Sequence, residues 1–138
     1  MNVYLDSSVV LRRLRRESAP LAGWATWEHA YASVLLRVET LRTIDRMRLT
    51  GVVADKHVAD LIRDAHAIFD VVEFVALNPA ILNRAAQSFR TAVGTLDALH
   101  LATALWLGEA GAIDLTFLTH DSALAVGARS ENFQVEGF

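Results

Sequence analysis

The first eleven residues, MNVYLDSSVVL (residues 1–11), contain the pattern on which the fold prediction rests. Residues 2–6 read as a short buried strand, and a helix is expected to follow over residues 8–16. The same succession recurs along the chain. Further strands are expected at residues 31–34, 71–76, 115–119 and 133–135, and further helices from Pro20 onward and at residues 36–49, 53–69, 79–90, 96–109 and 122–128.

Short apolar strands that alternate with helices predict an α/β fold, a parallel sheet covered by helices on both faces. Local signals support several boundaries. Gly51 should end the helix over residues 36–49, and Asn78 should cap a helix with Pro79 in its first turn. The chain contains no repeat and no linker, so residues 1–138 are expected to form a single domain.

The composition excludes several classes of protein. Hydrophobic residues make up 53% of the chain, but no apolar window approaches the roughly 18 residues that a membrane span needs. The N-terminus lacks the basic and apolar regions of a signal peptide. The chain has no cysteine, which excludes disulfides, thiolate metal sites and a cysteine nucleophile. These features predict a cytoplasmic protein.

The net charge of −3 is unevenly distributed. Residues 1–50 carry eight arginines and five acidic residues, whereas residues 51–138 carry five basic and eleven acidic residues. Four of the arginines lie close together, namely Arg12, Arg13, Arg15 and Arg16. This cluster could contact phosphates, or it could be a solvated helix end whose cations face the negative end of the helix dipole.

Four acidic residues, Asp6, Glu39, Asp97 and Asp121, lie at the ends of apolar stretches or within them. In parallel α/β folds the ligand site lies beyond the carboxyl ends of the strands, where Asp6 and Asp121 should be. Two like charges about 4 Å apart repel each other by roughly 4 kcal/mol at an effective dielectric constant near 20. Converging carboxylates therefore predict a bound cation, and an all-oxygen site suits Mg²⁺ or Mn²⁺.

Ordinary structural roles are the alternative for Asp6 and Asp121. Asp6 could cap the helix that follows it, although Ser7 or Ser8 could do so and leave Asp6 free to face the site. Asp121 could cap the helix that starts at residue 122. Thr119, at the end of the same strand as Asp121, could add a hydroxyl ligand.

Glu39 and Asp97 also have structural alternatives. Glu39 could form an ion pair with Arg42 on a solvated helix face. Asp97 lies in the first turn of an apolar helix, plausibly capped by Thr95, where an acid complements the helix dipole. That dipole also keeps the carboxylate ionised and ready to bind a cation.

Four segments of the sequence resemble the acidic motifs of PIN-domain ribonucleases, most closely VapC-type toxins of bacterial toxin–antitoxin systems. They are YLDSSVVL (residues 4–11), VET (38–40), TLDALHLATAL (95–105) and THDSALA (119–125). The match spans nearly the whole chain, with the motifs in the right order, and DALHLATA is its most specific part.

The resemblance implies a PIN-like three-layer α/β/α sandwich with a short parallel sheet. It also implies that Asp6, Glu39, Asp97 and Asp121 are the metal-binding catalytic acids. The implied activity is Mg²⁺-dependent cleavage of RNA by metal-activated water, with Mn²⁺ as a substitute and a 5′-phosphate as product. The implied partners are a second copy of the chain, in a homodimer, and a cognate antitoxin.

Other metal-dependent classes fit the sequence poorly. A phosphoacceptor receiver domain needs a lysine after a late strand, but the only lysine, Lys56, falls in a predicted helix. A haloacid dehalogenase phosphatase needs Asp or Thr two residues after its first aspartate, where this chain has Ser8. No histidine has a second histidine at zinc-binding spacing, so His100 and His120, beside the acids, are expected to have structural roles.

Two further interpretations stay open. The chain could be a PIN nuclease of RNA processing or decay that has no antitoxin, or a non-catalytic module that binds partners through an acidic groove. Trp24 and Trp27 are expected in the helix from Pro20, either packed in the core or lining the catalytic groove. In the second case they would anchor an antitoxin segment, because aromatic residues dominate interface hot spots.

Overall fold

The computed structural model describes residues 1–15 and 24–137. Within them, the strands are β1 (Asn2–Leu5), β2 (His29–Ser33), β3 (Glu73–Val75), β4 (Leu115–Leu118) and β5 (Gln134–Glu136). The helices are α1 (Ser7–Arg15), α2 (Leu35–Leu49), α3 (Asp55–Phe69), α4 (Pro79–Ala85), α5 (Thr95–Ala110) and α6 (Ser122–Ser130).

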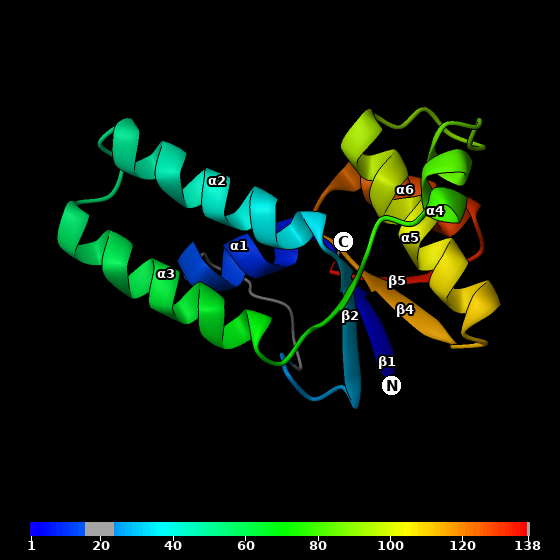
Figure 1. The fold of residues 1–138 in the computed structure, drawn as a ribbon, viewed down its shortest axis with the longest axis horizontal. Helices are drawn as coiled ribbons and strands as arrows, with labels where there is room; N and C mark the ends of the chain where they lie inside the picture. The colour runs from blue at the N-terminus through cyan, green and yellow to red at the C-terminus, as the bar shows by residue number, and fades with distance from the viewer. Residues whose placement is uncertain (16–23, 138) are drawn as a thin grey trace.

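The strands form one parallel sheet in the order β3-β2-β1-β4-β5. Alternate residues of β1 point to opposite faces, as in any strand. Val3 and Leu5 pack with α1, α2 and α3, whereas Tyr4 packs with α5 and α6. Figure 1 shows these two groups of helices on either side of the sheet. The predicted α/β/α sandwich is therefore confirmed.

The strand order places a topological switch point between β1 and β4. From β1 the chain runs outward through β2 to β3, and it then returns to pair β4 on the other side of β1. Because crossovers between parallel strands are right-handed, helices on the two sides of this point cover opposite faces. The loops after β1 and β4 thus diverge and leave a crevice at the carboxyl edge, where such folds bind ligands.

Two predicted boundaries are correct for the expected reasons. Gly51 follows the end of α2 with a φ of +76°, a left-handed conformation that glycine adopts at little cost. Asn78 caps α4, and its side-chain oxygen accepts a hydrogen bond of 2.8 Å from the backbone N–H of Ile81.

The predicted helix over residues 79–90 is too long, because α4 ends at Ala85. The guanidinium of Arg84 lies 4.1 Å from the ring centroid of Phe89 and donates a hydrogen bond of 3.2 Å to the carbonyl of Ser88. These contacts stabilise a turn in place of further helix. Thr95 is also not a cap: Gly94 occupies the capping position, and Thr95 is the first residue of α5.

The helix expected from Pro20 is only partly testable, because residues 16–23 lie outside the described residues. Trp24 and Trp27 themselves are in a turn and a bend, so their helical assignment is wrong. Their rings pack edge to face at 5.2 Å, against the core formed by α1, α2 and α3. Ala25 between them has a φ of +63°, which does not fit a helix.

Three arginines of the predicted basic cluster, Arg12, Arg13 and Arg15, lie in the last turn of α1, and Arg16 lies outside the described residues. The Arg13 guanidinium lies 5.5 Å from the centroid of the Trp24 ring. This position at the negative end of the α1 dipole agrees with the helix-end interpretation. Among the described helices, none has both the length and the apolar character needed to cross a membrane.

Candidate functional site

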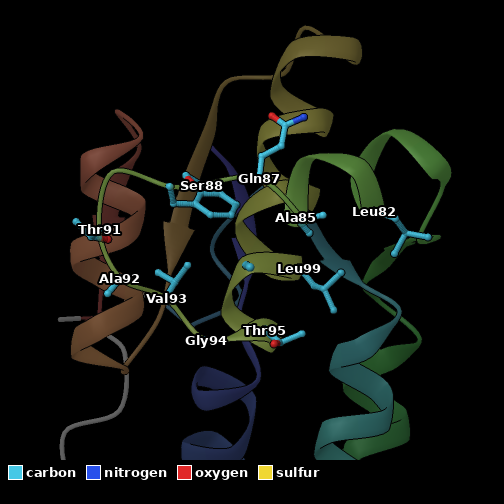
Figure 2. A pocket seen from close by; sticks show the side chains of 13 residues that line it. Leu82, Ala85, Gln87, Ser88, Thr91, Ala92, Val93, Gly94, Thr95 and Leu99 are labelled. Carbon is cyan, nitrogen blue, oxygen red and sulfur yellow. The ribbon is translucent and has the colours of Figure 1, made fainter.

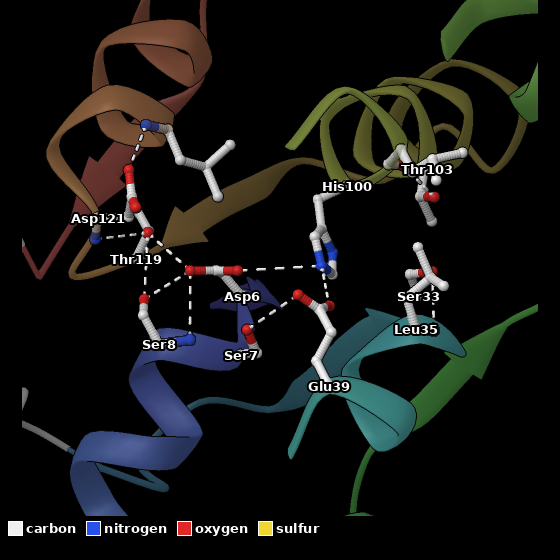
Figure 3. Close-up of polar contacts among 12 residues, drawn as sticks. Asp6, Ser7, Ser8, Ser33, Leu35, Glu39, His100, Thr103, Thr119 and Asp121 are labelled. Atoms are coloured by element: carbon white, nitrogen blue, oxygen red, sulfur yellow. Dashed lines mark hydrogen bonds and ion pairs between the residues drawn. The ribbon is translucent and has the colours of Figure 1, made fainter. Parts of the chain in front are cut away.

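Asp6 is the first residue after β1 and is 5% exposed. Its Oδ2 accepts hydrogen bonds from the Ser8 hydroxyl at 2.5 Å, the Thr119 hydroxyl at 3.0 Å and the Ser8 backbone N–H at 3.3 Å. The expectation that a serine would replace Asp6 as the cap is therefore wrong, because Oδ2 itself serves the start of α1. Oδ1 points the other way and lies 4.0 Å from Nε2 of His100 (Figure 3).

The turn between β4 and α6 is joined to the start of α1. The Thr119 hydroxyl, which is fully buried, donates to Asp6 and accepts a hydrogen bond of 3.0 Å from the backbone N–H of Asp121. The Ser8 hydroxyl accepts a hydrogen bond of 2.9 Å from the backbone N–H of His120. Each hydroxyl thus donates to the Asp6 carboxylate and accepts from the turn, which sets the distance between the two strand ends.

Asp121 caps α6, as its structural alternative predicted. Its Oδ1 accepts a hydrogen bond of 2.9 Å from the backbone N–H of Leu124. Figure 3 shows Asp121 beside Thr119, on the same edge of the sheet as Asp6. The cap holds the carboxylate at the crevice and does not remove it from the site.

Glu39 projects from the second turn of α2 toward α5. Its Oε1 lies 2.6 Å from Nε2 of His100, and its Oε2 accepts a hydrogen bond of 3.4 Å from the Ser7 hydroxyl. Arg42, the partner in the structural alternative, binds Asp45 instead at 3.4 Å. The surface ion-pair interpretation of Glu39 is therefore wrong.

His100 was not selected from the sequence as a site residue, but it lies between Asp6 and Glu39 and is fully buried. Burial alone would lower its pKa, but the hydrogen bond to Glu39 and the negative charges of nearby carboxylates raise the pKa overall. The sequence contained one usable signal. His100 follows Asp97 by three residues in a helix, and this spacing places two side chains on one face.

Asp97 lies half-buried in the first turn of α5. Burial raises its pKa to about 6, and the negative charges of Asp121 and Asp6 act in the same direction. Repulsion from Glu39 adds to this, whereas His100 opposes it. Asp97 therefore carries negative charge that its surroundings leave uncompensated.

The four predicted acids thus come together at one edge of the sheet. Their oxygen donors suit a hard divalent cation, and the raised pKa of Asp97 shows that a positive charge would relieve the local repulsion. Over residues 1–15 and 24–137, however, no three acidic or histidine side chains already form a metal-binding group. The residues fit such an ion by their chemistry, while His100 engages Glu39 and the α6 cap engages Asp121.

A hollow of about 660 Å³ lies beside the acidic cluster, between α4, the loop over residues 86–94 and the start of α5. Figure 2 shows its lining. None of the four acids lines it, but Thr95 and Ala98, on either side of Asp97, do. Asp97 thus lies in the same first turn of α5 as residues that line the hollow.

Trp24 and Trp27 do not border the acidic cluster, so of the two alternatives core packing is correct and groove lining is wrong. They precede the first residue of β2, whereas the acids lie at the carboxyl ends of the strands. Together with Ile68 of α3 and Val72, which follows that helix, they line a separate apolar pocket of about 210 Å³. Parallel strands place their starts and their ends at opposite edges of the sheet, which separates the tryptophans from the acids.

Comparisons with known proteins agree with this geometry. The structure resembles that of VapBC2 from Rickettsia felis bound to a DNA fragment from its promoter, with a TM-score of 0.66 and 12% identity over 99% of this chain and 98% of that chain. It also resembles the structure of FitAB bound to an IR36 DNA fragment, with a TM-score of 0.67 and 15% identity over 98% and 93%.

At such low identity the two structures support the fold alone. No curated protein matches the sequence. The model of one family, described as PIN domain, matches residues 3–129, which is nearly the whole chain. With its parallel sheet and its acids at the β1/β4 switch point, the chain belongs to the PIN domain family.

Proposed function

We propose that this protein is a metal-dependent endoribonuclease, the toxin of a toxin–antitoxin pair. The observation that carries the proposal is the meeting of Asp6, Glu39, Asp97 and Asp121 at the switch point, with the pKa of Asp97 raised to about 6. Membership of the PIN domain family, a family of nucleases, supports hydrolysis of phosphodiester bonds.

The four acids would hold Mg²⁺, or Mn²⁺ in its place. When bound, such an ion activates water and neutralises charge at a phosphodiester. The protein's own contribution is orientation. Three hydrogen bonds hold Oδ2 of Asp6 and leave Oδ1 toward the site. The α6 cap holds Asp121 in place, and burial of Asp6 and His100 keeps bulk water from one side of the cluster.

Hydrolysis would then break the bond between phosphorus and the 3′ oxygen of the RNA. The oxygen of the attacking water forms a new bond to phosphorus and gives the 5′-phosphate, and the departing 3′ oxygen takes up a proton. We propose that nucleotides next to the cut bond occupy the hollow beside Asp97. The hydroxyl and amide groups of Ser88, Thr95 and Gln87 along that hollow can bind sugar or base edges.

Two protein partners belong to the proposal. The neighbouring structures are complexes, VapBC2 and FitAB, both bound to DNA, and they support an antitoxin partner for this chain. A second copy of the chain would complete a homodimer. Trp24 and Trp27 are not expected to anchor an antitoxin segment at the catalytic site, because these residues lie away from the acids.

The deciding experiment measures cleavage of a mixed RNA pool by the purified protein with and without Mg²⁺, followed by sequencing of the new 5′ ends. We expect Mg²⁺-dependent cleavage that is lost on chelation and in the variant Asp6→Asn, which should keep the native circular dichroism spectrum. Asp45→Asn is the control and should cleave normally. It removes a partly exposed acid that pairs with Arg42 on the same helix as Glu39. Absence of cleavage under all metal conditions would favour the non-catalytic acidic-groove module.

The antitoxin part is tested separately. Expression of the chain alone should arrest growth, and coexpression of a DNA-binding protein encoded directly upstream should restore it. If cleavage is present but no neighbouring gene relieves its effect, the alternative of a PIN nuclease without an antitoxin is correct.

A further inference from the structure

A buried chain of hydrogen bonds runs from the backbone of β2 to the acidic cluster. The backbone N–H of Ser33 donates to the hydroxyl of Tyr4 at 3.2 Å, and this hydroxyl lies 2.9 Å from Nδ1 of His100. On the other side of the ring, Nε2 lies 2.6 Å from Oε1 of Glu39. Ser33, Tyr4 and His100 are each fully buried.

This series of hydrogen bonds leaves a proton on Nε2, facing Glu39, whether His100 is neutral or charged. If the ring is neutral and Glu39 is ionised, the carboxylate can only accept a hydrogen bond, so the ring proton resides on Nε2 and the Tyr4 hydroxyl donates to Nδ1. If the ring is charged, Nδ1 donates to the Tyr4 oxygen, which can accept two hydrogen bonds. In both cases Nε2 donates to Glu39, while Nδ1 is bound to the Tyr4 hydroxyl that the backbone of Ser33 also holds.

Tyr4 itself is held rigidly. Its ring stacks on Phe117 of β4 at a centroid distance of 5.1 Å, with 27° between the ring planes. It lies on the face of β1 that packs against α5, the helix that carries His100. The position of the Tyr4 hydroxyl is thus set by its contacts with the sheet and with α5, and not by α2.

We propose that Tyr4 is a positioning residue of the metal site, which acts through His100 to orient the carboxylate of Glu39. This inference rests on the proposed function, because it takes Glu39 to be a metal ligand. Glu39 needs such support more than Asp6 does. Its side chain has one more rotatable bond, and its only other protein hydrogen bond among the described residues is the long one from Ser7.

With Oε1 bound to His100, Oε2 is the oxygen left to face a cation. Asp6 is arranged in the same way, with Oδ2 held by the protein and Oδ1 facing the site. Groups that hold metal ligands in place typically change metal affinity about 10- to 100-fold when they are removed. Loss of the Tyr4 hydroxyl should therefore be visible in metal binding, before any reaction takes place.

The test is a double-mutant cycle on Mn²⁺ affinity, measured by calorimetry or by electron paramagnetic resonance on the metal-free protein. Tyr4→Phe removes only the hydroxyl, and we expect Mn²⁺ to bind roughly tenfold more weakly. His100→Gln can still donate to Glu39 but loses the link to Tyr4. Adding Tyr4→Phe to His100→Gln should therefore weaken binding by less than twofold further.

Thr40→Val is the matched control. Thr40 follows Glu39 in α2, is fully buried, and has a hydroxyl without a hydrogen-bond partner among the described residues. Its replacement should leave Mn²⁺ affinity unchanged. If Tyr4 merely stabilises the core, Tyr4→Phe will lower the melting temperature and leave Mn²⁺ affinity as it is, and this result overturns the inference.

Equal effects of Tyr4→Phe in the two backgrounds would also overturn it, since Tyr4 would then not act through His100. Should Tyr4→Phe fail to fold, His100→Leu, which cannot donate to Glu39, decides: unchanged Mn²⁺ affinity in that variant refutes the positioning role. The proposed function fails by a different result, namely wild-type protein that neither binds Mn²⁺ nor cleaves RNA. Wild-type binding and cleavage together with an unaffected Tyr4→Phe variant refute only the positioning role.

Discussion

At the scale of single residues, the site is a balance of charge. Asp6 accepts hydrogen bonds from neutral donors and Glu39 is bound to His100, whereas Asp97 is half-buried among other carboxylates. His100 lies beside Asp6 and Glu39, on one side of the cluster. Ionisation of Asp97 should therefore lower the stability of the metal-free protein.

The first prediction concerns the pH dependence of stability. The pKa of Asp97 is raised from 3.8 to about 6 by burial and by neighbouring charges, so between these values the folded state holds more protons than the unfolded state. Stability then falls as the pH rises through this window. Asp97→Asn should melt at or above the wild-type temperature at pH 7.5 without metal, and this advantage should shrink toward pH 4.

Glu109→Gln is the control for that prediction, because it removes an exposed carboxylate from the other end of α5. Its melting temperature should follow that of the wild type at every pH. The gain from Asp97→Asn should be modest, since solvent screens a half-buried group. A variant that is markedly less stable than the wild type at pH 7.5 would contradict the repulsion described above.

At the scale of elements, the N-terminal ends of the helices both stabilise the fold and form the site. α1, α2, α5 and α6 all begin at the carboxyl edge of the sheet, so their positive dipole ends surround the acids. Asp121 shows the overlap most clearly, because one carboxylate both caps α6 and faces the crevice. Two substitutions can separate these roles.

Asp121→Asn should keep the cap, because asparagine and aspartate cap helices about equally well, and should therefore keep the wild-type melting temperature. Asp121→Ala should lose about 1 kcal/mol of unfolding free energy. If Asp121 is a ligand, both variants should bind Mn²⁺ more weakly. Full Mn²⁺ affinity in Asp121→Asn would leave this residue with the cap alone.

The hollow between α4 and α5 gives an element-scale prediction about substrate. Ala92 is exposed on its loop wall, so Ala92→Glu adds negative charge there without disturbing the core. RNA should be repelled, and KM should rise several-fold while kcat and Mn²⁺ affinity stay the same. Ala59→Glu makes the same change of charge on the exposed face of α3 and should leave KM unaltered.

At the scale of the whole molecule, metal binding should be linked to folding. The acids come from segments far apart in sequence and meet only in the native state, so the unfolded chain has no equivalent site. Selective binding to the native state at 100 times the dissociation constant stabilises a protein by about 2.7 kcal/mol. For a chain of this size that corresponds to a rise of several degrees in Tm.

We therefore expect saturating Mg²⁺ or Mn²⁺ to raise the Tm of the wild type by several degrees, as measured by scanning calorimetry. The double variant Asp6→Asn with Asp97→Asn should respond by less than one-third of that amount. Equal shifts in both proteins would place the metal site elsewhere on the molecule.

Much of this molecule follows from local pattern in the sequence. Apolar runs with period two or near 3.6, together with Asn78, Pro79 and Gly51 as boundary signals, predict the order of the five strands and six helices that the structure describes, although they also predicted helix at Trp24 and Trp27, where there is none. Parallel strands end at one edge, so the pattern also implied that Asp6 and Asp121 would be neighbours. These conclusions need only interactions between residues close in sequence and the geometry of a parallel sheet.

The remaining features were decided only by the tertiary structure, because they depend on contacts between residues that are distant in sequence. The order of the strands created the switch point, and it placed Tyr4, 96 residues from His100, within hydrogen-bonding distance of it. The contact between Arg84 and Phe89 accompanies the early end of α4, and helix propensities of single residues do not predict such a contact. A local pattern states where a side chain points from its own element, but only packing determines which partner it meets.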